Sequence, residues 1–310
     1  MRNFKKTLLL LLVCSMLLFT SCAGFVTSNK FEAADFEIKG INKISVKCSA
    51  NIHVIKTESD KIILEMEKWV SGIENHSAFL EGIKINVKKF DETLFLELVY
   101  PSSFFISLKS YGVKLTLKIP SVYSGKLFVD NFSNSTKIED FNGEVEVKNF
   151  DGNVDIIKVN NNVCVESNSG EVRLDSVIGN IKVDNKGEKT HIINSTGIFN
   201  INNSYGMIRM SNCEFLNGTH SLKAENEPVD LNIRIPETGY IDITASDIKV
   251  CMNKNSKLTM NASVFLGDIN INNLNYEKIT NGIYKFNGGS DSLKLLLNCN
   301  VGDINIYGVE

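Results

Sequence analysis

The sequence predicts an all-β protein, and within that class a parallel β-helix, or β-solenoid, built from nine-residue units of one strand and one corner. Three observations lead to this fold class. Glycine recurs every nine residues in the middle of the chain, apolar residues alternate after each glycine, and no proline-, glycine- or serine-rich linker divides the part beyond the N-terminus. We therefore expect one continuous β-solenoid body over residues 35–310.

The first 21 residues have the pattern of an export signal. MRNFKK is short and basic, and TLLLLLVCSMLLF is an apolar run of secretory length that is too short for a comfortable membrane span. LLFTSCAG resembles a bacterial lipoprotein signal, although Phe19 stands where leucine is usual. Cys22 is therefore the predicted lipidation site, with a signal peptide at 1–21 and a lipid anchor and tether at 22–34. The alternative is an ordinary signal peptide cut near Ala23, which would leave a secreted protein.

A diacylglyceryl group on Cys22 would keep the mature protein on the membrane. At about 0.8 kcal/mol per buried methylene, two long acyl chains contribute on the order of 20 kcal/mol. We therefore expect an extracytoplasmic protein, lipid-anchored in the cell envelope, whose first partner is the membrane. The formal net charge of the 310 residues is −3, so the chain lacks the basic bias of a nucleic-acid-binding protein.

The nine-residue repeat carries the fold prediction. Two and four residues after each marker stand apolar side chains, a pattern that Thr190 alone breaks, so each unit is a strand with one buried face. Glycine supplies the backbone freedom of the corner. No single coil can bury its apolar face alone, which makes stacked coils the stable arrangement. The markers are Gly143, Gly152, Asn161, Gly170, Gly179, Glu188, Gly197 and Gly206.

The number of sides in each coil follows less directly. The two markers that are not glycine, Asn161 and Glu188, lie three units apart, so the pattern of glycine, glycine, other has a period of three units. This spacing favours a coil of three units, with one unit on each of three sides. A flattened coil of two units, with two sides, is the alternative.

Outward charges also bear on the register. A three-sided coil would stack Glu146 over Arg173 and Asp155 over Lys182, which places opposite charges beside each other at about 4.8 Å. A two-sided coil would stack Asp155 over Arg173 but Glu146 over Cys164. The charge match is more complete for three sides.

The flanking segments continue the alternation. ISVKCSANIHV and KIILEME alternate near the start, GIKINVKKF and TLFLELVY form a hairpin-like pair, and GVKLTLKIP leads into the repeats. Near the end, the segments GDININ at 267 and GDINIY at 302 share their first five residues. We expect strands throughout, almost no helix, and the least regular portion between Trp69 and Gly112.

Neither a disulfide framework nor a metal site is expected. Beyond the signal and Cys22 the cysteines are odd in number, widely spaced and without a C-x-x-C pair, and the four histidines stand alone. No cofactor motif is present, so no cofactor is expected. The cysteines concerned are Cys48, Cys164, Cys213, Cys251 and Cys299.

At this point the residues resemble the bacterial putative-adhesin β-strand-repeat family, an exported group. The resemblance covers residues 36–310 and rests on the G-[DEN]-[VI]-x-[VIL] phrases, the LTLKIP lead-in and the closing GDINIYG. It implies a parallel β-helix on the cell surface or envelope, connected in some members with adhesion or envelope stress. It brings no catalytic residues.

A β-helix polysaccharide lyase or hydrolase is the alternative function. Such enzymes gather acidic or basic groups on one outer face. Here the acidic residues are interleaved with asparagine and lysine at ordinary outward positions, so we expect a protein that is not an enzyme and has no catalytic residues. The acidic candidates are Glu144, Glu146, Asp155, Glu171 and Asp175.

The predicted function is an adhesin-like surface binding or scaffold module that contacts a surface glycan or an envelope protein. YPSSFFISLKSYG supplies the candidate partner-binding residues Phe104, Phe105 and Tyr111, because aromatic side chains in a non-repetitive segment suit a sugar or protein contact. The alternative is that these rings cap the end of the solenoid core.

Overall fold

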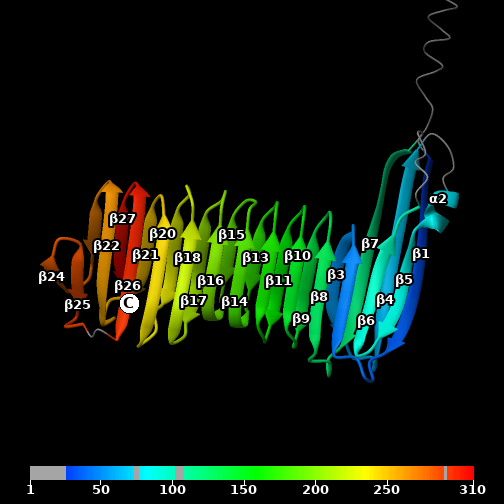
Figure 1. Cartoon of the computed structure of the whole chain (residues 1–310), viewed down its shortest axis with the longest axis horizontal. Coiled ribbons are helices and arrows are strands. Elements are labelled where there is room, and N and C mark those ends of the chain that lie inside the picture. Colours follow the sequence, from blue (N-terminus) through cyan, green and yellow to red (C-terminus); the bar gives the residue numbers. More distant parts are fainter. Residues whose placement is uncertain (1–25, 73–76, 102–107, 290–291) are drawn as a thin grey trace, which may run out of the picture.

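The computed structural model describes residues 26–72, 77–101, 108–289 and 292–310. Within these residues a continuous sheet of 27 strands winds along the long axis of the molecule, and a single helix, α2 (Ser77–Gly82), lies at the N-terminal end (Figure 1). The predicted all-β character is confirmed.

The central part of the molecule is a stack of coils with two strands each. Every strand pairs in parallel with the next strand on its own side and with the previous one. One side contains β8 (Lys126–Asn131), β10 (Val145–Asn149), β12 (Val163–Ser167), β14 (Ile178–Asn185), β16 (Thr196–Asn203), β18 (Gly218–Ala224) and β20 (Gly239–Ala245). The other side contains β9 (Thr136–Phe141), β11 (Val154–Val159), β13 (Val172–Asp175), β15 (Thr190–Ile193), β17 (Ile208–Phe215), β19 (Val229–Arg234) and β21 (Ile248–Asn253).

The regular coil contains two of the nine-residue units, so the prediction of three sides is wrong. Val145 of β10 pairs with Val163 of β12, two units later, and β11 pairs with β13 at the same interval. The outward neighbours are those of the two-sided alternative: Asp155 lies beside Arg173, and Glu146 beside Cys164. Exposed charge pairs are individually weak, which is why they did not determine the register.

The prediction of three sides relied on the two markers that are not glycine, and the corners at these two positions are built differently from the others. At Asn161 the side-chain Oδ1 accepts a hydrogen bond of 2.8 Å from the Asn162 backbone N–H, so asparagine itself supports the corner. At Glu188 the glycine stands one position earlier, and a Cβ on Gly187 would lie 2.5 Å from the Gly170 backbone nitrogen. The three-unit interval between the markers is therefore no structural period.

The alternating apolar columns form the core. Residues such as Val145, Val147, Val154 and Ile156 are fully buried between the two sides of the coil, while the residues between them are at least partly exposed. This is the period-two pattern that the sequence predicts. Thr190, the exception in the columns, is buried as well.

The N-terminal end closes the stack with longer strands. β2 pairs with β6 and β8, β3 pairs with β7 and β9, and the predicted hairpin of β5 and β6 is present. These strands are β1 (Val26–Glu37), β2 (Lys43–Cys48), β3 (Asn51–Thr57), β4 (Lys61–Gly72), β5 (Lys84–Phe90), β6 (Thr93–Val99) and β7 (Leu108–Pro120).

Part of the predicted tether is a strand. Residues 26–34, expected to link the anchor to the body, belong to β1, which pairs with β4 along its whole length. The ladder runs from Val26 opposite Gly72 to Glu37 opposite Lys61. Because antiparallel pairing satisfies the backbone of this polar segment, it needs no alternating apolar pattern, and the strands of the described part include Val26–Ala34 as well as the predicted body.

β1, β4 and β7 extend beyond the coils and form a blade. Asn51 at the start of β3 pairs with Lys114, so Leu108–Val113 of β7 continue past β3, and among the described strands they pair with β4 alone. We call this part of β7, with Lys68–Gly72 of β4 and Val26–Lys30 of β1, the blade. It rises above the row of corners that follows β8, β10 and β16, which we call the upper edge (Figure 1).

At the C-terminal end the two similar GDIN segments lie on paired strands. β23 (Ile269–Asn272) pairs with β27 (Ile304–Val309), and Ile269 lies opposite Ile304, so GDININ and GDINIY lie side by side. β26 is inserted between β20 and β22. The remaining strands here are β22 (Leu258–Leu266), β24 (Tyr276–Thr280), β25 (Ile283–Phe286) and β26 (Leu293–Val301).

A column of buried polar residues lies just inside the upper edge. It repeats once in every coil, at the ends of successive strands on one side of the stack. We call these residues the asparagine ladder; its members are Asn131, Asn149, Ser167, Asn185 and Asn203. Their side chains bond to the corner backbone, as Asn149 does through Nδ2 to the Gly152 carbonyl at 2.7 Å.

Candidate binding pocket at the blade

An aromatic pocket lies where the blade meets the upper edge. Its volume is about 380 Å³, within the range of small-ligand sites. The ends of β4 and β7, the residue after β6 and the corners that follow β2 and β8 contribute its walls. The lining residues are Ser49, Asn51, Trp69, Tyr100, Tyr111, Gly112, Val113, Ser133 and Asn134.

The indole of Trp69 packs over a glycine. Trp69 lies opposite Gly112 in the pairing of β4 with β7. A Cβ built on Gly112 would lie 2.1 Å from Cζ2 of Trp69, so the ring occupies the space that any other side chain would fill. An aromatic ring across a strand glycine restores the packing that glycine lacks. The pair therefore positions the ring on the pocket wall.

Two tyrosines form the second aromatic wall. The rings of Tyr100 and Tyr111 meet edge to face, with centroids 5.7 Å apart, and Tyr111 makes a similar contact with Phe79 at 5.2 Å. Tyr100 Oη donates a hydrogen bond of 2.5 Å to the Ser49 carbonyl. Burial, with smaller effects from Tyr111 and Cys48, raises the pKa of Tyr100, so this hydroxyl remains a donor.

The opposite rim is polar and uncharged. Asn51 Oδ1 accepts a hydrogen bond of 3.3 Å from the Ser135 backbone N–H, and Asn134 Nδ2 donates one of 3.2 Å to Ser133 Oγ. Asn134 has a φ of 73°, a left-handed conformation that asparagine tolerates at corners. Among the described residues that line the pocket, none carries a formal charge. The pocket thus combines aromatic faces with amide and hydroxyl groups.

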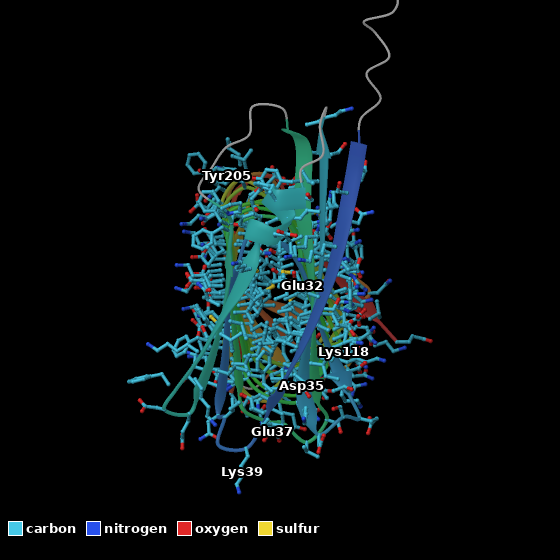
Figure 2. The ribbon with its side chains drawn as sticks, turned by 90° about the vertical axis from the view of Figure 1, so that its right-hand side faces the viewer. Glu32, Asp35, Glu37, Lys39, Lys118 and Tyr205 are labelled. Carbon is cyan, nitrogen blue, oxygen red and sulfur yellow. The ribbon has the colours of Figure 1, made fainter. Side chains whose placement is uncertain are left out.

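A buried lysine fixes the blade to the helix beside it. The Lys68 side chain is fully buried, and Nζ donates to the carbonyls of Leu80 at 2.9 Å and Ile83 at 2.6 Å. It also pairs with Glu32 at 2.9 Å, which joins β1 to the same point (Figure 2 labels Glu32). Phe79, the neighbour of Tyr111, is thereby held on the helix that Lys68 caps.

The predicted binding residues have different outcomes. Tyr111 lines the pocket and is 47% exposed. Phe104 and Phe105, like Cys22, lie outside the described residues. Sequence reasoning missed Trp69 and Tyr100, because they lie on segments that meet only through the pairing of β4 with β7 and the corner at residue 49.

Other features of the described residues are less suggestive of a binding site. A larger recess of about 640 Å³ has a mainly asparagine and charged lining without an aromatic ring. The five cysteines of the described part are free, and no group of three potential metal ligands occurs there. Among the same residues, no helix is long and apolar enough to cross a membrane.

Comparison with known proteins gives distant matches among solved structures. No curated protein matches it. A "putative cell adhesion protein" from Clostridium sporogenes is 15% identical, with 91% of this chain and 100% of that chain covered and a TM-score of 0.29. From Parabacteroides distasonis, a "putative adhesin" is 11% identical (90% and 97% covered, TM-score 0.41), and a "putative lipid binding protein" is 15% identical (91% and 97%, TM-score 0.34).

The family assignment rests on a sequence model that spans most of the chain. The model for Toastrack DUF4097 matches residues 41–307, which begin just before β2 and end within β27. The matched part includes the whole stack of coils and the pocket. The chain therefore belongs to the Toastrack DUF4097 family.

Proposed function

We propose that this protein is a lipid-anchored binding module of the cell envelope, and that its blade pocket holds a neutral sugar of a surface glycan. The single observation that carries the proposal is the pocket itself, with three aromatic residues on one side and uncharged amides and hydroxyls on the other.

The chemistry of the pocket suits a sugar. The apolar C–H face of a pyranose packs on aromatic rings, as Trp69 and Tyr111 offer, while its hydroxyls need donors and acceptors at the rim. Asn51, Ser133 and Asn134 supply both kinds of group. Because the described lining residues carry no charge, a neutral sugar matches them better than a phosphate or carboxylate ligand. The volume of about 380 Å³ fits one or two sugar units.

The position of β1 supports the anchor. β1 begins at Val26, at the tip of the blade, four residues after the predicted lipid-bearing Cys22 (Figure 1). A chain of four residues spans at most about 14 Å. Lipid on Cys22 would hold the blade and its pocket close to the membrane surface.

The polysaccharide-cleaving alternative receives less support. Most of its acidic candidates have a cation beside them: Lys126 contacts Glu144 at 2.9 Å and Glu146 at 2.6 Å, and Arg173 contacts Asp175 at 2.6 Å. Such pairs fit an outer ladder of charges along the stack. They favour binding over acid and base catalysis.

Titration with neutral oligosaccharides released from the host envelope tests the glycan proposal. The Cys22→Ala protein, purified from the cytoplasm or secreted fraction, is titrated calorimetrically. We expect Tyr111→Ala to weaken binding at least tenfold, because it removes one aromatic wall. Tyr205→Ala is the matched control, since Tyr205 is an exposed tyrosine in the corner after β16, four strand steps along the stack from the pocket corner after β8. Equal loss in both variants, or no binding by the parent protein, would exclude this site.

The anchor is tested separately. Intact mass and membrane fractionation of the protein from its own host should show a diacyl adduct on the wild type and none on Cys22→Ala. Release of unmodified wild-type protein would contradict the anchor and would indicate a secreted binding module instead.

A further inference from the structure

An exposed apolar corner lies at the end of the upper edge farthest from the blade. Phe265 is 82% exposed, the largest value among the big apolar side chains of the described residues, and Leu266 and Val301 are each 59% exposed. Leu266 and Val301 are register partners in β22 and β26, and Phe265 precedes Leu266, so three exposed apolar residues lie near the ends of two neighbouring strands. We call them the apolar corner. Exposed clusters of this kind mark contacts with a partner or a membrane.

The apolar corner and the start of β1 belong to the same edge. β22 and β26 run parallel to β20, β18 and β16, and all of them end at the upper edge. Figure 2 shows Tyr205, on this edge, at the same end of the molecule as the start of β1, with Lys39 at the opposite end. A surface that receives the N-terminus therefore faces the apolar corner as well.

The outline of the molecule decides which points a flat surface can touch. The blade rises by six residues of β7, about 20 Å, above the upper edge. From β2 to β22 the stack makes nine strand steps, or about 43 Å. A plane resting on the tip of the blade therefore meets the far end of the edge next, with the strands tilted by roughly 25° from its normal. That far end is the apolar corner.

We infer that the mature protein lies on its membrane through two contacts, the lipid on Cys22 and the apolar corner inserted among the lipids. The inference rests on the proposed anchor and adds an orientation to it. Because the anchor already holds the chain at the bilayer, even weak insertion of Phe265 and Leu266 suffices for the second contact. The pocket then lies in the notch between the two contacts and faces molecules at the membrane surface.

The aspartates beside the apolar corner indicate which lipid headgroup it suits. Asp268, Asp303 and Asp247 follow one another on the adjacent corners, where Asp303 Oδ1 accepts from the Asp268 N–H at 2.9 Å and Asp247 Oδ1 accepts from the Asp303 N–H at 3.0 Å. These carboxylates repel an anionic surface. The corner therefore fits a zwitterionic headgroup region better than an anionic one.

Tryptophan quenching by brominated lipid tests the orientation. The full lipidated chain is placed in phosphatidylcholine vesicles with and without bromine on the acyl chains, in a Trp69→Phe background that removes the only native tryptophan. Phe265→Trp reports on the apolar corner. Ile178→Trp is the matched control, because Ile178 is 54% exposed at the start of β14, on the opposite edge. We expect at least twofold quenching of Phe265→Trp, no quenching of Ile178→Trp, and weaker quenching when anionic lipid is added.

The outcomes separate the orientation from the anchor. If both variants float with the vesicles but are quenched equally or not at all, the orientation is overturned and the anchor stands. If the emission of Phe265→Trp changes with protein density and not with bromine, a second copy covers the corner and the orientation is again overturned. Failure of the wild type to float would overturn the anchor and the orientation together.

Discussion

The side-chain amide of Asn203 donates a hydrogen bond of 3.0 Å to the hydroxyl of Thr190 on the facing strand, and both residues are fully buried. Asn185 Nδ2 bonds to the same hydroxyl oxygen at 3.3 Å, so one threonine joins two rungs of the asparagine ladder. Three coils earlier, the Thr136 hydroxyl also joins two rungs, but there it accepts from Asn131 Nδ2 and donates to Asn149 Oδ1. The break in the apolar columns at Thr190 is thus a polar link between the two sides of the stack.

Thr190→Val should destabilise the protein although it keeps the shape of the side chain. It leaves the buried amides of Asn185 and Asn203 without one partner each, at a cost of about 1–3 kcal/mol. A valine in the apolar column offsets a part of this cost. Urea unfolding followed by circular dichroism measures the difference. Thr244→Val, on the outward face of β20, is the control and should change the stability by less than about 0.5 kcal/mol.

The repeat predicts the strands and their faces but not the coil. Alternation after each marker identifies which residues enter the core, since this depends only on the period of two within a strand. The number of sides depends on how corners turn, and Asn161 and Gly187 show that one corner can be made in several ways. The asparagine ladder repeats with every second unit, and this spacing is the sequence signal that the prediction of three sides overlooked.

The pocket was only partly predictable. Tyr111 is visible as an aromatic residue in an irregular segment, but Trp69 and Tyr100 join it only once β4, β6 and β7 are placed. Such long-range pairing leaves no local trace. The one sequence clue is Gly112, a glycine inside a strand pattern, which often marks a close approach of another group.

Acid should weaken the protein through His220. Its Nδ1 accepts a hydrogen bond of 3.2 Å from the Phe199 N–H, so Nε2 donates to the Leu216 carbonyl at 2.7 Å and the ring is neutral. Burial, opposed by the bond to Leu216, lowers the pKa of His220. The unfolded chain therefore binds the proton more readily, and the free energy of unfolding falls as the pH drops below about 6.5.

The urea midpoint at pH 7.5 and pH 5 measures this dependence. His220→Gln retains one acceptor and one donor without a titratable ring, so its midpoint should fall less between the two pH values. His191, whose pKa is also lowered by burial and by nearby Lys189 and Arg209, leaves a residual slope in the variant. Identical slopes in wild type and variant would show that His220 does not control the acid sensitivity.

Gly112→Ala should displace the indole that forms one wall of the pocket. The added methyl would lie 2.1 Å from the ring of Trp69, so the ring or the strand must move, with a loss of about 1–3 kcal/mol. Trp69 is the only tryptophan in the chain, so the emission spectrum reports its environment directly and should shift to longer wavelength. Ser110→Ala, two residues away on β7, should leave the spectrum unchanged. An unshifted spectrum in Gly112→Ala would contradict the packing of Trp69 over the glycine.

Lys68→Met should loosen the blade and α2 together. The methionine keeps the apolar stem but leaves the carbonyls of Leu80 and Ile83 and the carboxylate of Glu32 without their cation. Loss of charged hydrogen bonds to the two buried carbonyls costs about 2–3 kcal/mol, while Glu32 is partly exposed and can be solvated by water.

Hydrogen exchange locates the effect of Lys68→Met. Amides of α2 and of β1 should exchange faster in the variant, whereas those of the central coils should keep their protection, because the lysine joins only the elements at the N-terminal end. Lys61→Met is the control, since Lys61 pairs with Asp35 and Glu37 at the surface. Uniform loss of protection along the whole stack would mean that the blade and the coils unfold as one unit, and the pocket could then not open separately from the solenoid.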